Sequence, residues 1–424
     1  MSLASLRGRP PAYLARRAAS LTRRYGIGDA KAIRRLRRCV DVLAGYDVLP
    51  TFATPGAVIE REPGFFRELA ALGVELAVHG HDHVDFRTLE PAEARRQFER
   101  AAAAFERSGI SFDGFRCPYL SYTDAVAKVV PREMFRYSSN EAISWEVLPR
   151  RAGGATYAQL GEFYAGKAAR ETVSTPCAIN GLVEIPLSLP DDLQLLDGVG
   201  LRGEEIAETW SAILDETHRR GELFAPLFHP ETFDLIRVAI VVIVERARRL
   251  QPAVWTAQLR ELAHWWKERS RFTATHSVEG RALRVDLQCS RRATVLARDW
   301  PKGAGTIPWE GRYRILSART VRLEPGIRPF VGVSGVSDRV TEFLGGQGYI
   351  VDSGPDAPSC TVHINGKPEL AARSDVELLA YIESSTGPLL RFSRWPDGAK
   401  SALCLAGDLD ALSLRDYASR LLPR

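Results

Sequence analysis

The residue types best suited to chemistry lie near the two ends of the chain. His79 and His83 follow an apolar run and enter a glycine-containing loop. Asp408 and Asp410 follow another apolar run close to the C-terminal end. Two imidazoles and one carboxylate can hold a metal ion while leaving coordination positions open for water and substrate. If the two ends of the chain meet in the fold, these residues form a hydrolytic metal centre.

Three further residues stand at the ends of short apolar segments. Arg116 can pair with a carboxylate, and the proline before Tyr119 fixes a turn whose next N–H can face a developing oxyanion. His229 has an ordinary pKa near neutrality, which suits a general acid. Taken singly, each of these residues is also typical of a structural turn or a buried cap. His81 is expected to point away from its two histidine neighbours and to line or support the site.

The elements that must position these residues alternate regularly. Up to residue 268, short apolar segments alternate with helical patterns, which predicts a parallel α/β sheet or barrel. Beyond about residue 270, shorter alternating runs punctuated by glycine and proline predict strands. We expect four parts: a barrel over 1–268, a small β-rich module over 269–328, a mixed α/β connecting segment over 329–394, and a C-terminal strand and helix over 395–424.

Length and composition are those of a soluble globular protein with more than one domain, or with one large domain and an appended module. The 424 residues exceed one ordinary domain, and 45% hydrophobic with 26% charged residues is typical of globular proteins. A net charge of +5 does not favour a nucleic-acid partner, and the arginine-rich first 40 residues are attributed to overall composition. The six cysteines form no CxxC pair, and no apolar run suits a signal peptide or an integral membrane segment. A cytoplasmic location is expected.

The ordered motifs together resemble the polysaccharide deacetylase family, also called the NodB-homology or carbohydrate esterase family 4 domain. The resemblance rests on His79-Gly-x-x-His83, the Arg116–Tyr119 segment, the segment 183–192, and His229 within Leu-Phe-His-Pro. It covers roughly residues 30–268. It implies a distorted (β/α)7 barrel with its active site at the C-terminal ends of the strands.

One motif of that family is displaced. The family's first strand normally ends in an Asp-Asp or Asp-x-Asp motif, yet nothing similar precedes His79, and the motif occurs instead at Asp408 and Asp410. This arrangement predicts a circularly permuted barrel whose last strand takes the first position. Two alternatives remain: the aspartates cap the last helix, or they reach the barrel of a second chain in a swapped homodimer.

The resemblance also implies roles for the residues. Asp410, His79 and His83 would bind one divalent metal, most often Zn²⁺ in such sites. Asp408 would act as the general base and Arg116 would pair with it. The Tyr119 N–H would stabilise the oxyanion and His229 would protonate the leaving amine. Either Asp191 or Asp192 would hold Arg116 or His229.

The implied reaction is hydrolysis of a C–N bond other than a peptide bond, with an N-acetylated sugar or a related glycan as substrate. Two alternatives stay open. One is a metal-free amidase acting on a small cyclic amide, which metal content distinguishes. The other is a non-catalytic protein that binds a glycan or a partner, although such a protein has no need of two carboxylates at a strand tip.

Overall fold

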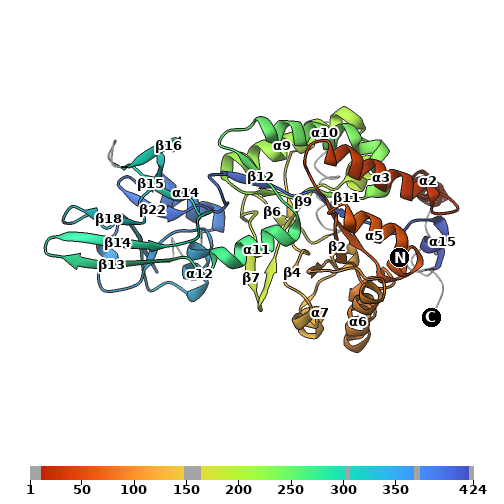
Figure 1. The fold of residues 1–424 in the computed structure, drawn as a ribbon, viewed down its shortest axis with the longest axis horizontal. Coiled ribbons are helices and arrows are strands. Elements are labelled where there is room, and N and C mark those ends of the chain that lie inside the picture. The colour runs from red at the N-terminus through yellow and green to blue at the C-terminus, as the bar shows by residue number, and fades with distance from the viewer. Residues whose placement is uncertain (1–10, 148–163, 301–304, 367–372, 420–424) are drawn as a thin grey trace.

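The computed structural model describes residues 11–147, 164–300, 305–366 and 373–419 (Figure 1). An α/β part, built from the first 269 residues and the end of the chain, lies beside a β-rich part built from the residues between them. The C-terminal segment returns from the β-rich part, so that α15 (Leu414–Ser419) lies near α2 (Pro11–Arg24). Leu414 N donates to Gly26 O at 2.9 Å, which brings the two ends of the described chain together.

An eight-stranded sheet forms the centre of the α/β part. Its strand order is β11 (Leu227–Phe228), β24 (Ala406–Asp408), β1 (Thr51–Thr54), β2 (Glu75–Val78), β3 (Gly114–Phe115), β4 (Tyr137–Ser138), β8 (Leu182–Glu184) and β7 (Cys177–Ile179). All pairs are parallel except β7 with β8. Most of these strands are buried on both faces, as their continuous apolar runs require. The carboxyl ends of the parallel strands therefore meet at one edge.

The last strand of the chain lies inside this sheet. β24 pairs in parallel with β1 on one side and with β11 on the other. Asp408 is opposite Ala53, and Gly407 is opposite Phe228. A Cβ on Gly407 would lie 3.1 Å from Pro230 Cδ and 3.2 Å from the Phe228 ring, so glycine permits this close insertion. The tip of β24 is thereby set beside the tips of β1 and β11.

The apolar segments that lead to His229 and to Asp408 are each divided into two short strands. The segment 223–229 divides into β10 (Leu223–Phe224) and β11, because Pro226 has no N–H for a continuous ladder. The C-terminal segment divides at the same level into β23 (Ser401–Leu403) and β24. β23 pairs with β10 and with β12 (Val254–Thr256), a strand that the sequence analysis did not predict. The result is a curled sheet that is divided into sections. The number of strand–helix units in a (β/α)7 barrel stays a prediction.

A third section of sheet continues the curl. It consists of β6 (Lys167–Ala168), β5 (Ala142–Ser144) and β9 (Leu187–Leu189). A parallel bridge between Ser188 and Pro226 connects β9 to the β10–β11 segment, and Ser188 N donates to Ala225 O at 2.8 Å. The sheet thus curls back towards β11 without one uninterrupted ladder.

Helices cover the outside of the curled sheet (Figure 1). They are α3 (Ala30–Ala44), α4 (Gly56–Arg61), α5 (Pro63–Ala71), α6 (Pro91–Arg107), α7 (Asp124–Val129), α9 (Gly203–Arg220), α10 (Phe233–Arg249) and α11 (Leu259–Arg269). α10 buries Phe233, Ile236, Ile240 and Ile243, which recur at helical spacing. Among the described residues, no helix combines the length and apolar character needed to cross a membrane.

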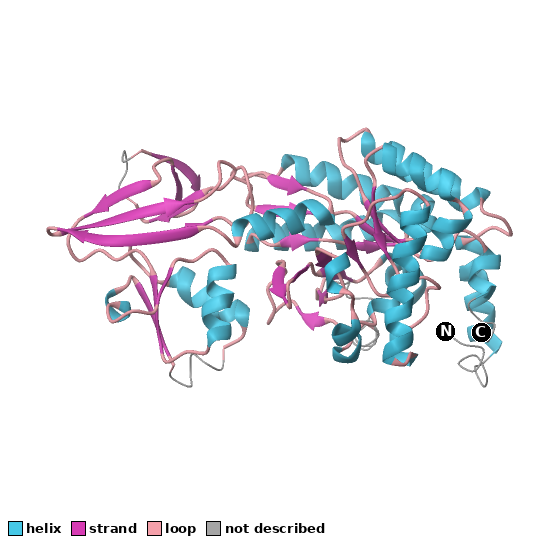
Figure 2. Ribbon diagram, turned by 60° about the horizontal axis from the view of Figure 1, so that its bottom comes forward, coloured by secondary structure: helices cyan, strands magenta, loops and turns pink. Residues whose placement is uncertain are grey.

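The β-rich part contains antiparallel and parallel sheets (Figure 2). Its elements are β13 (Thr273–Glu279), β14 (Ala282–Gln288), β15 (Val295–Arg298), β16 (Thr306–Glu310), β17 (Tyr313–Leu316), β18 (Thr320–Leu323), β19 (Val331–Ser334), α12 (Asp338–Gly346), β20 (Val351–Asp352), β21 (Val362–Asn365), α14 (Asp375–Ser384) and β22 (Leu389–Phe392). β19, β20 and β21 form a small parallel sheet. β22, from the predicted connecting segment, pairs instead with β15 of the predicted β-rich module. Long-range pairing of this kind leaves no local sequence signal.

Tryptophans join the two parts of the molecule. The Trp395 ring lies 6.3 Å from the Trp255 ring and 5.8 Å from the Trp266 ring, measured between centroids. The Trp255 ring lies 6.5 Å from the Trp265 ring. Trp265 Nε1 donates to Arg394 O at 2.8 Å, and Trp395 Nε1 donates to Gly221 O at 3.0 Å. Buried aromatic rings with satisfied N–H groups fix the point where the chain turns back towards β23.

Candidate active site and metal centre

The cluster His79, His83 and Asp410 lies where β2 and β24 end at the same edge of the sheet. His83 Nε2 is 2.6 Å from Asp410 Oδ1, and His79 Nε2 is 4.0 Å from the same oxygen. One ligand atom from each of the three residues lies within 4.8 Å of the others. Parallel pairing of β24 with β1, and of β1 with β2, brings these distant parts of the sequence together.

The donor atoms in this cluster fit a divalent metal ion. His79 Nδ1 donates to Arg116 O at 2.9 Å, which leaves the lone pair on Nε2. That buried Nε2 has no hydrogen-bond partner among the described residues. Burial lowers the pKa of His79, and a neutral ring is the form that binds metal. A histidine held through Nδ1 by a carbonyl, beside a second histidine and a carboxylate, matches a zinc ligand set.

Asp408 and Arg116 form a buried ion pair beside this cluster. Arg116 Nη1 donates to Asp408 Oδ1. The remaining guanidinium nitrogens bind Ser139: Nε donates to its carbonyl and Nη2 to its hydroxyl, both at 3.0 Å. Arg116 is therefore held on several sides, and it occupies one carboxylate oxygen only. The other oxygen, Asp408 Oδ2, lies 3.8 Å from His79 Nε2 and so faces the metal cluster.

His229 and Asp192 form the third pair at this edge. His229 Nδ1 donates to Asp192 Oδ1 at 2.7 Å, while the His229 backbone N–H and the Thr232 hydroxyl donate to Oδ2. Burial alone favours the neutral ring, but the Asp192 carboxylate outweighs it and raises the pKa of His229 to about 10. Its Nε2 lies 4.0 Å from Asp410 Oδ2. A protonated imidazole therefore points towards the metal cluster.

The raised pKa of His229 predicts a pH-dependent term in stability. The folded-state pKa of about 10 exceeds the ordinary value of about 6.5. The stabilisation is complete below about pH 6.5 and is lost as the pH rises through about 10. In metal-free protein, Asp192→Asn should remove most of this pH dependence, whereas Asp215→Asn, at an exposed pair with Arg246, should not. Unfolding free energies against pH test this, and identical profiles for wild type and Asp192→Asn would contradict it.

Arg24 and Glu231 reach the cluster from elements that the sequence analysis did not connect with it. Arg24 Nη2 donates to Asp410 Oδ2 at 2.9 Å and to Glu231 Oε1 at 2.6 Å. Tyr25 OH also donates to Glu231 Oε1, at 2.9 Å. Burial alone would raise the pKa of Asp410, but its interactions with His83, Arg24 and His229 lower it well below its usual range. Arg24 thus holds Asp410 ionised and leaves Oδ1 towards the histidines.

Tyr119, Asp191 and His81, which the sequence analysis also proposed for the site, lie around the metal-ligand cluster or point away from it. Tyr119 has a left-handed backbone (φ 59°), and its ring centroid is 5.0 Å from that of His83. Asp191 accepts from Tyr164 OH at 2.8 Å, and burial raises its pKa to about 6. His81 turns away from the cluster and pairs with Asp82 and Glu60 through its two ring nitrogens.

The hydrogen bonds at the start of α15 do not involve the two aspartates that the helix-cap alternative would place there. At the start of α15, the amides of Leu412 and Ser413 donate to Asp416 Oδ2 at 2.9 and 3.0 Å. Asp408 is bound by Arg116, and Asp410 by His83 and Arg24. The start of the last helix is therefore capped locally by Ser413 and Asp416, and the contacts of the Asp-x-Asp pair are directed to the sheet edge.

Part of this chain matches a known protein family. Residues 29–137 match the family model for polysaccharide deacetylase. Over these residues, the chain is similar to the polysaccharide deacetylase family. The match includes His79, His83, Arg116 and Tyr119, and it ends before His229 and the two C-terminal aspartates. The resemblance inferred from the sequence motifs is thus confirmed.

Three solved structures are similar to this chain over about half of its length. A putative polysaccharide deacetylase from Mycobacterium smegmatis is 21% identical, with 56% of this chain and 78% of that one covered and a TM-score of 0.43. A PuuE allantoinase is 15% identical, with 55% and 72% covered and a TM-score of 0.43. A family 4 carbohydrate esterase from Streptomyces lividans, in complex with acetate, is 17% identical, with 50% and 80% covered and a TM-score of 0.29. No curated protein matches the chain.

Proposed function

We propose that this chain is a metal-dependent hydrolase that removes the acetyl group of an N-acetylated sugar. One observation supports this most: a metal-ligand cluster, a carboxylate–arginine pair and a histidine–carboxylate pair face one another at a single sheet edge. Asp408 Oδ2 is 3.8 Å from His79 Nε2, and His229 Nε2 is 4.0 Å from Asp410 Oδ2. Amide hydrolysis needs a base, an acid and an electrophile together, and these groups supply them.

His79, His83 and Asp410 would hold the metal, for which zinc is the best fit to the donor set. When bound, the ion polarises the amide carbonyl and lowers the pKa of water. Asp408 accepts the proton of the attacking water at Oδ2, because Arg116 occupies Oδ1. His229, kept protonated by Asp192, donates its Nε2 proton to the leaving nitrogen as the C–N bond breaks. The Tyr119 N–H would stabilise the oxyanion, as the family resemblance implies.

We also propose that the deacetylase domain is circularly permuted and that Asp408 and Asp410 act within their own chain. The position of β24 between β11 and β1 supports this, because it supplies the carboxylates that are missing before His79. Arg24 strengthens the argument, since a residue near the start of the chain contacts Asp410 near its end. A swapped arrangement is not needed to complete the cluster.

Acetate release from N-acetylglucosamine and its short oligomers tests the function. We expect release that is lost after chelation and restored by added zinc. Hydrolysis of a small cyclic amide that survives chelation would indicate the metal-free amidase instead. Binding of the sugars without release, in zinc-loaded protein, would indicate a non-catalytic glycan-binding protein. Either result would overturn the proposal.

A further inference from the structure

The loop that joins His79 to His83 has a strained backbone. Gly80 and His83 both adopt left-handed conformations, with φ angles of 64° and 51°. A residue other than glycine is uncommon in this conformation, which costs free energy, so the surrounding contacts must hold His83 there. The rings of His79 and His83 lie 4.9 Å apart, measured between centroids. The conformation of this loop therefore decides whether both rings reach one metal ion.

Two helices pair the backbone polar groups of this loop. The first two backbone amides of α4 donate to the carbonyls of Gly80 and His81, at 2.9 and 3.1 Å. On α6, Gln97 Oε1 accepts from His81 N at 3.1 Å and from Asp82 N at 3.0 Å. Backbone N–H groups only donate, so the amide oxygen of Gln97, and not its nitrogen, faces them. Gln97 thus fixes the middle of the loop.

Gln97 is itself held in place by a buried carboxylate. Its side chain belongs to a residue that is 3% exposed, and its Nε2 donates to Asp82 Oδ2 at 3.0 Å. Arg100, three residues further along α6, donates to the same oxygen at 3.0 Å. Asp82 Oδ1 lies 2.8 Å from His81 Nδ1. Because both ends of the Gln97 amide are bonded, this side chain has one orientation and links α6 firmly to the loop.

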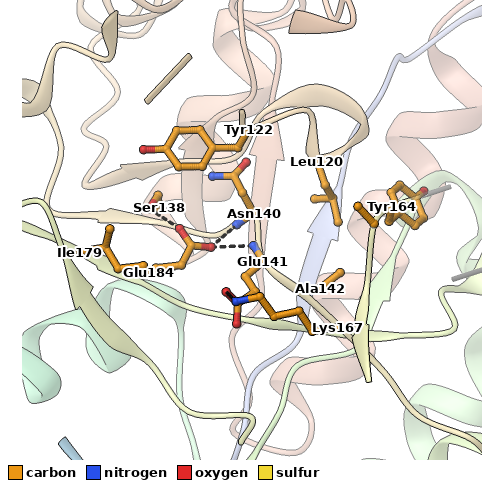
Figure 3. Close-up of a pocket in the computed structure, with 11 residues that line it drawn as sticks. Leu120, Tyr122, Ser138, Asn140, Glu141, Ala142, Tyr164, Lys167, Ile179 and Glu184 are labelled. Carbon is orange, nitrogen blue, oxygen red and sulfur yellow. Dashed lines mark hydrogen bonds and ion pairs between the residues drawn. The ribbon is translucent and has the colours of Figure 1, made fainter. Parts of the chain in front are cut away.

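A second buried side chain binds backbone amides at this edge of the sheet. Glu184 Oε1 accepts from Asn140 N at 2.5 Å and from Glu141 N at 2.7 Å (Figure 3). The same loop includes Ser139, which binds Arg116 through its carbonyl and its hydroxyl. Glu184 therefore supports a loop that carries none of the three metal ligands, and it offers a comparison for Gln97.

We propose that Gln97 is a positioning residue for the metal centre, and that it holds the loop of His79 and His83 in its metal-binding conformation before any metal is bound. The inference rests on the proposed function, because it takes His79, His83 and Asp410 as the metal ligands. It deepens that function by assigning part of the metal affinity to a residue on α6 that binds the backbone between two ligands. A loop that is already ordered loses little conformational freedom when the ion enters, which strengthens binding.

Gln97→Met tests this role, because it keeps the length of the side chain and removes the acceptor of both amides. We expect zinc affinity, measured by competition with a chromogenic chelator, to fall about 10- to 100-fold, as for other residues that orient metal ligands. Gln97→Glu retains the acceptor, with Arg100 beside Asp82 to offset the added charge, and should recover most of the lost affinity. Glu184→Met is the matched control: it removes the acceptor of two other amides and should lower stability, yet keep zinc affinity near the wild-type value.

Amide hydrogen exchange in metal-free wild-type protein tests the preformed loop without any variant. The N–H groups of His81 and Asp82 should exchange at least about 100-fold more slowly than in an unstructured chain. Rapid exchange that slows only when zinc is added would overturn the inference, because the ion would then order the loop.

Wild-type zinc affinity in Gln97→Met, or equal losses of affinity in Gln97→Met and Glu184→Met, would also overturn the inference and leave the proposed function standing. Absence of zinc binding by the wild-type protein would overturn the proposed function, and this inference with it.

Discussion

Asp408→Asn is expected to lower kcat for acetate release by a factor of about 10² to 10⁴, the usual contribution of a general base. Asparagine has nearly the same shape and still accepts from Arg116 through its amide oxygen, but it cannot take a proton from water. Asp408 is not in the ligand cluster, so the variant should still bind about one metal per chain. Initial rates and metal analysis on the same preparation measure both effects.

The control for this variant is Asp215→Asn, which makes the same change at an exposed ion pair with Arg246. It should keep wild-type rates, metal content and thermal stability. Full activity in Asp408→Asn would remove Asp408 from the role of base. Loss of metal together with activity would instead show that Asp408 is a ligand, since its Oδ2 lies close to His79 Nε2.

Arg24→Gln is expected to weaken metal binding about 10- to 100-fold, the usual effect of losing a residue that orients a metal ligand. Arg24 is 3% exposed and is the cation that joins Asp410 to Glu231. Its loss leaves the fully buried Glu231 without its cation and should lower the free energy of unfolding by about 3–5 kcal/mol. Competition with a chromogenic chelator measures the affinity, and denaturant unfolding measures the stability.

A double variant separates these two effects. Arg24→Gln with Glu231→Gln removes both buried charges, so stability should recover in part, while metal affinity stays low because Asp410 still lacks its partner. Arg23→Gln is the matched control, because Arg23 is on the same helix but pairs at the surface with Asp197. Wild-type metal affinity in Arg24→Gln would contradict the role assigned to Arg24.

The sequence predicted the parts of the site that local pattern determines. Apolar runs before His79, His229 and Asp408 predicted buried strands, and parallel strands place their carboxyl ends at one edge. The insertion of the C-terminal strand was predictable because a carboxylate was missing elsewhere, not from any feature of residues 401–410 alone. The cytoplasmic location and the part boundaries stay predictions.

The remaining features depend on tertiary contacts that leave no local pattern. Arg24 is one arginine in an arginine-rich segment, and only the position of α2 in space brings it to Asp410. Asn140 lies in a loop whose shape is fixed by a carboxylate from β8. The prediction of one strand over 223–229 was wrong, because Pro226 divides it, and the matching division between β23 and β24 has no proline to signal it.

The central claim is that the end of the chain completes a metal site begun near its start, and metal content tests it most directly. Wild-type protein and Asp410→Ala should be purified in parallel, loaded with zinc, dialysed and analysed for metal per chain. The account predicts about one zinc in the wild type and a large loss in Asp410→Ala, with both proteins folded. Equal zinc in the two proteins, or none in the wild type, would contradict it.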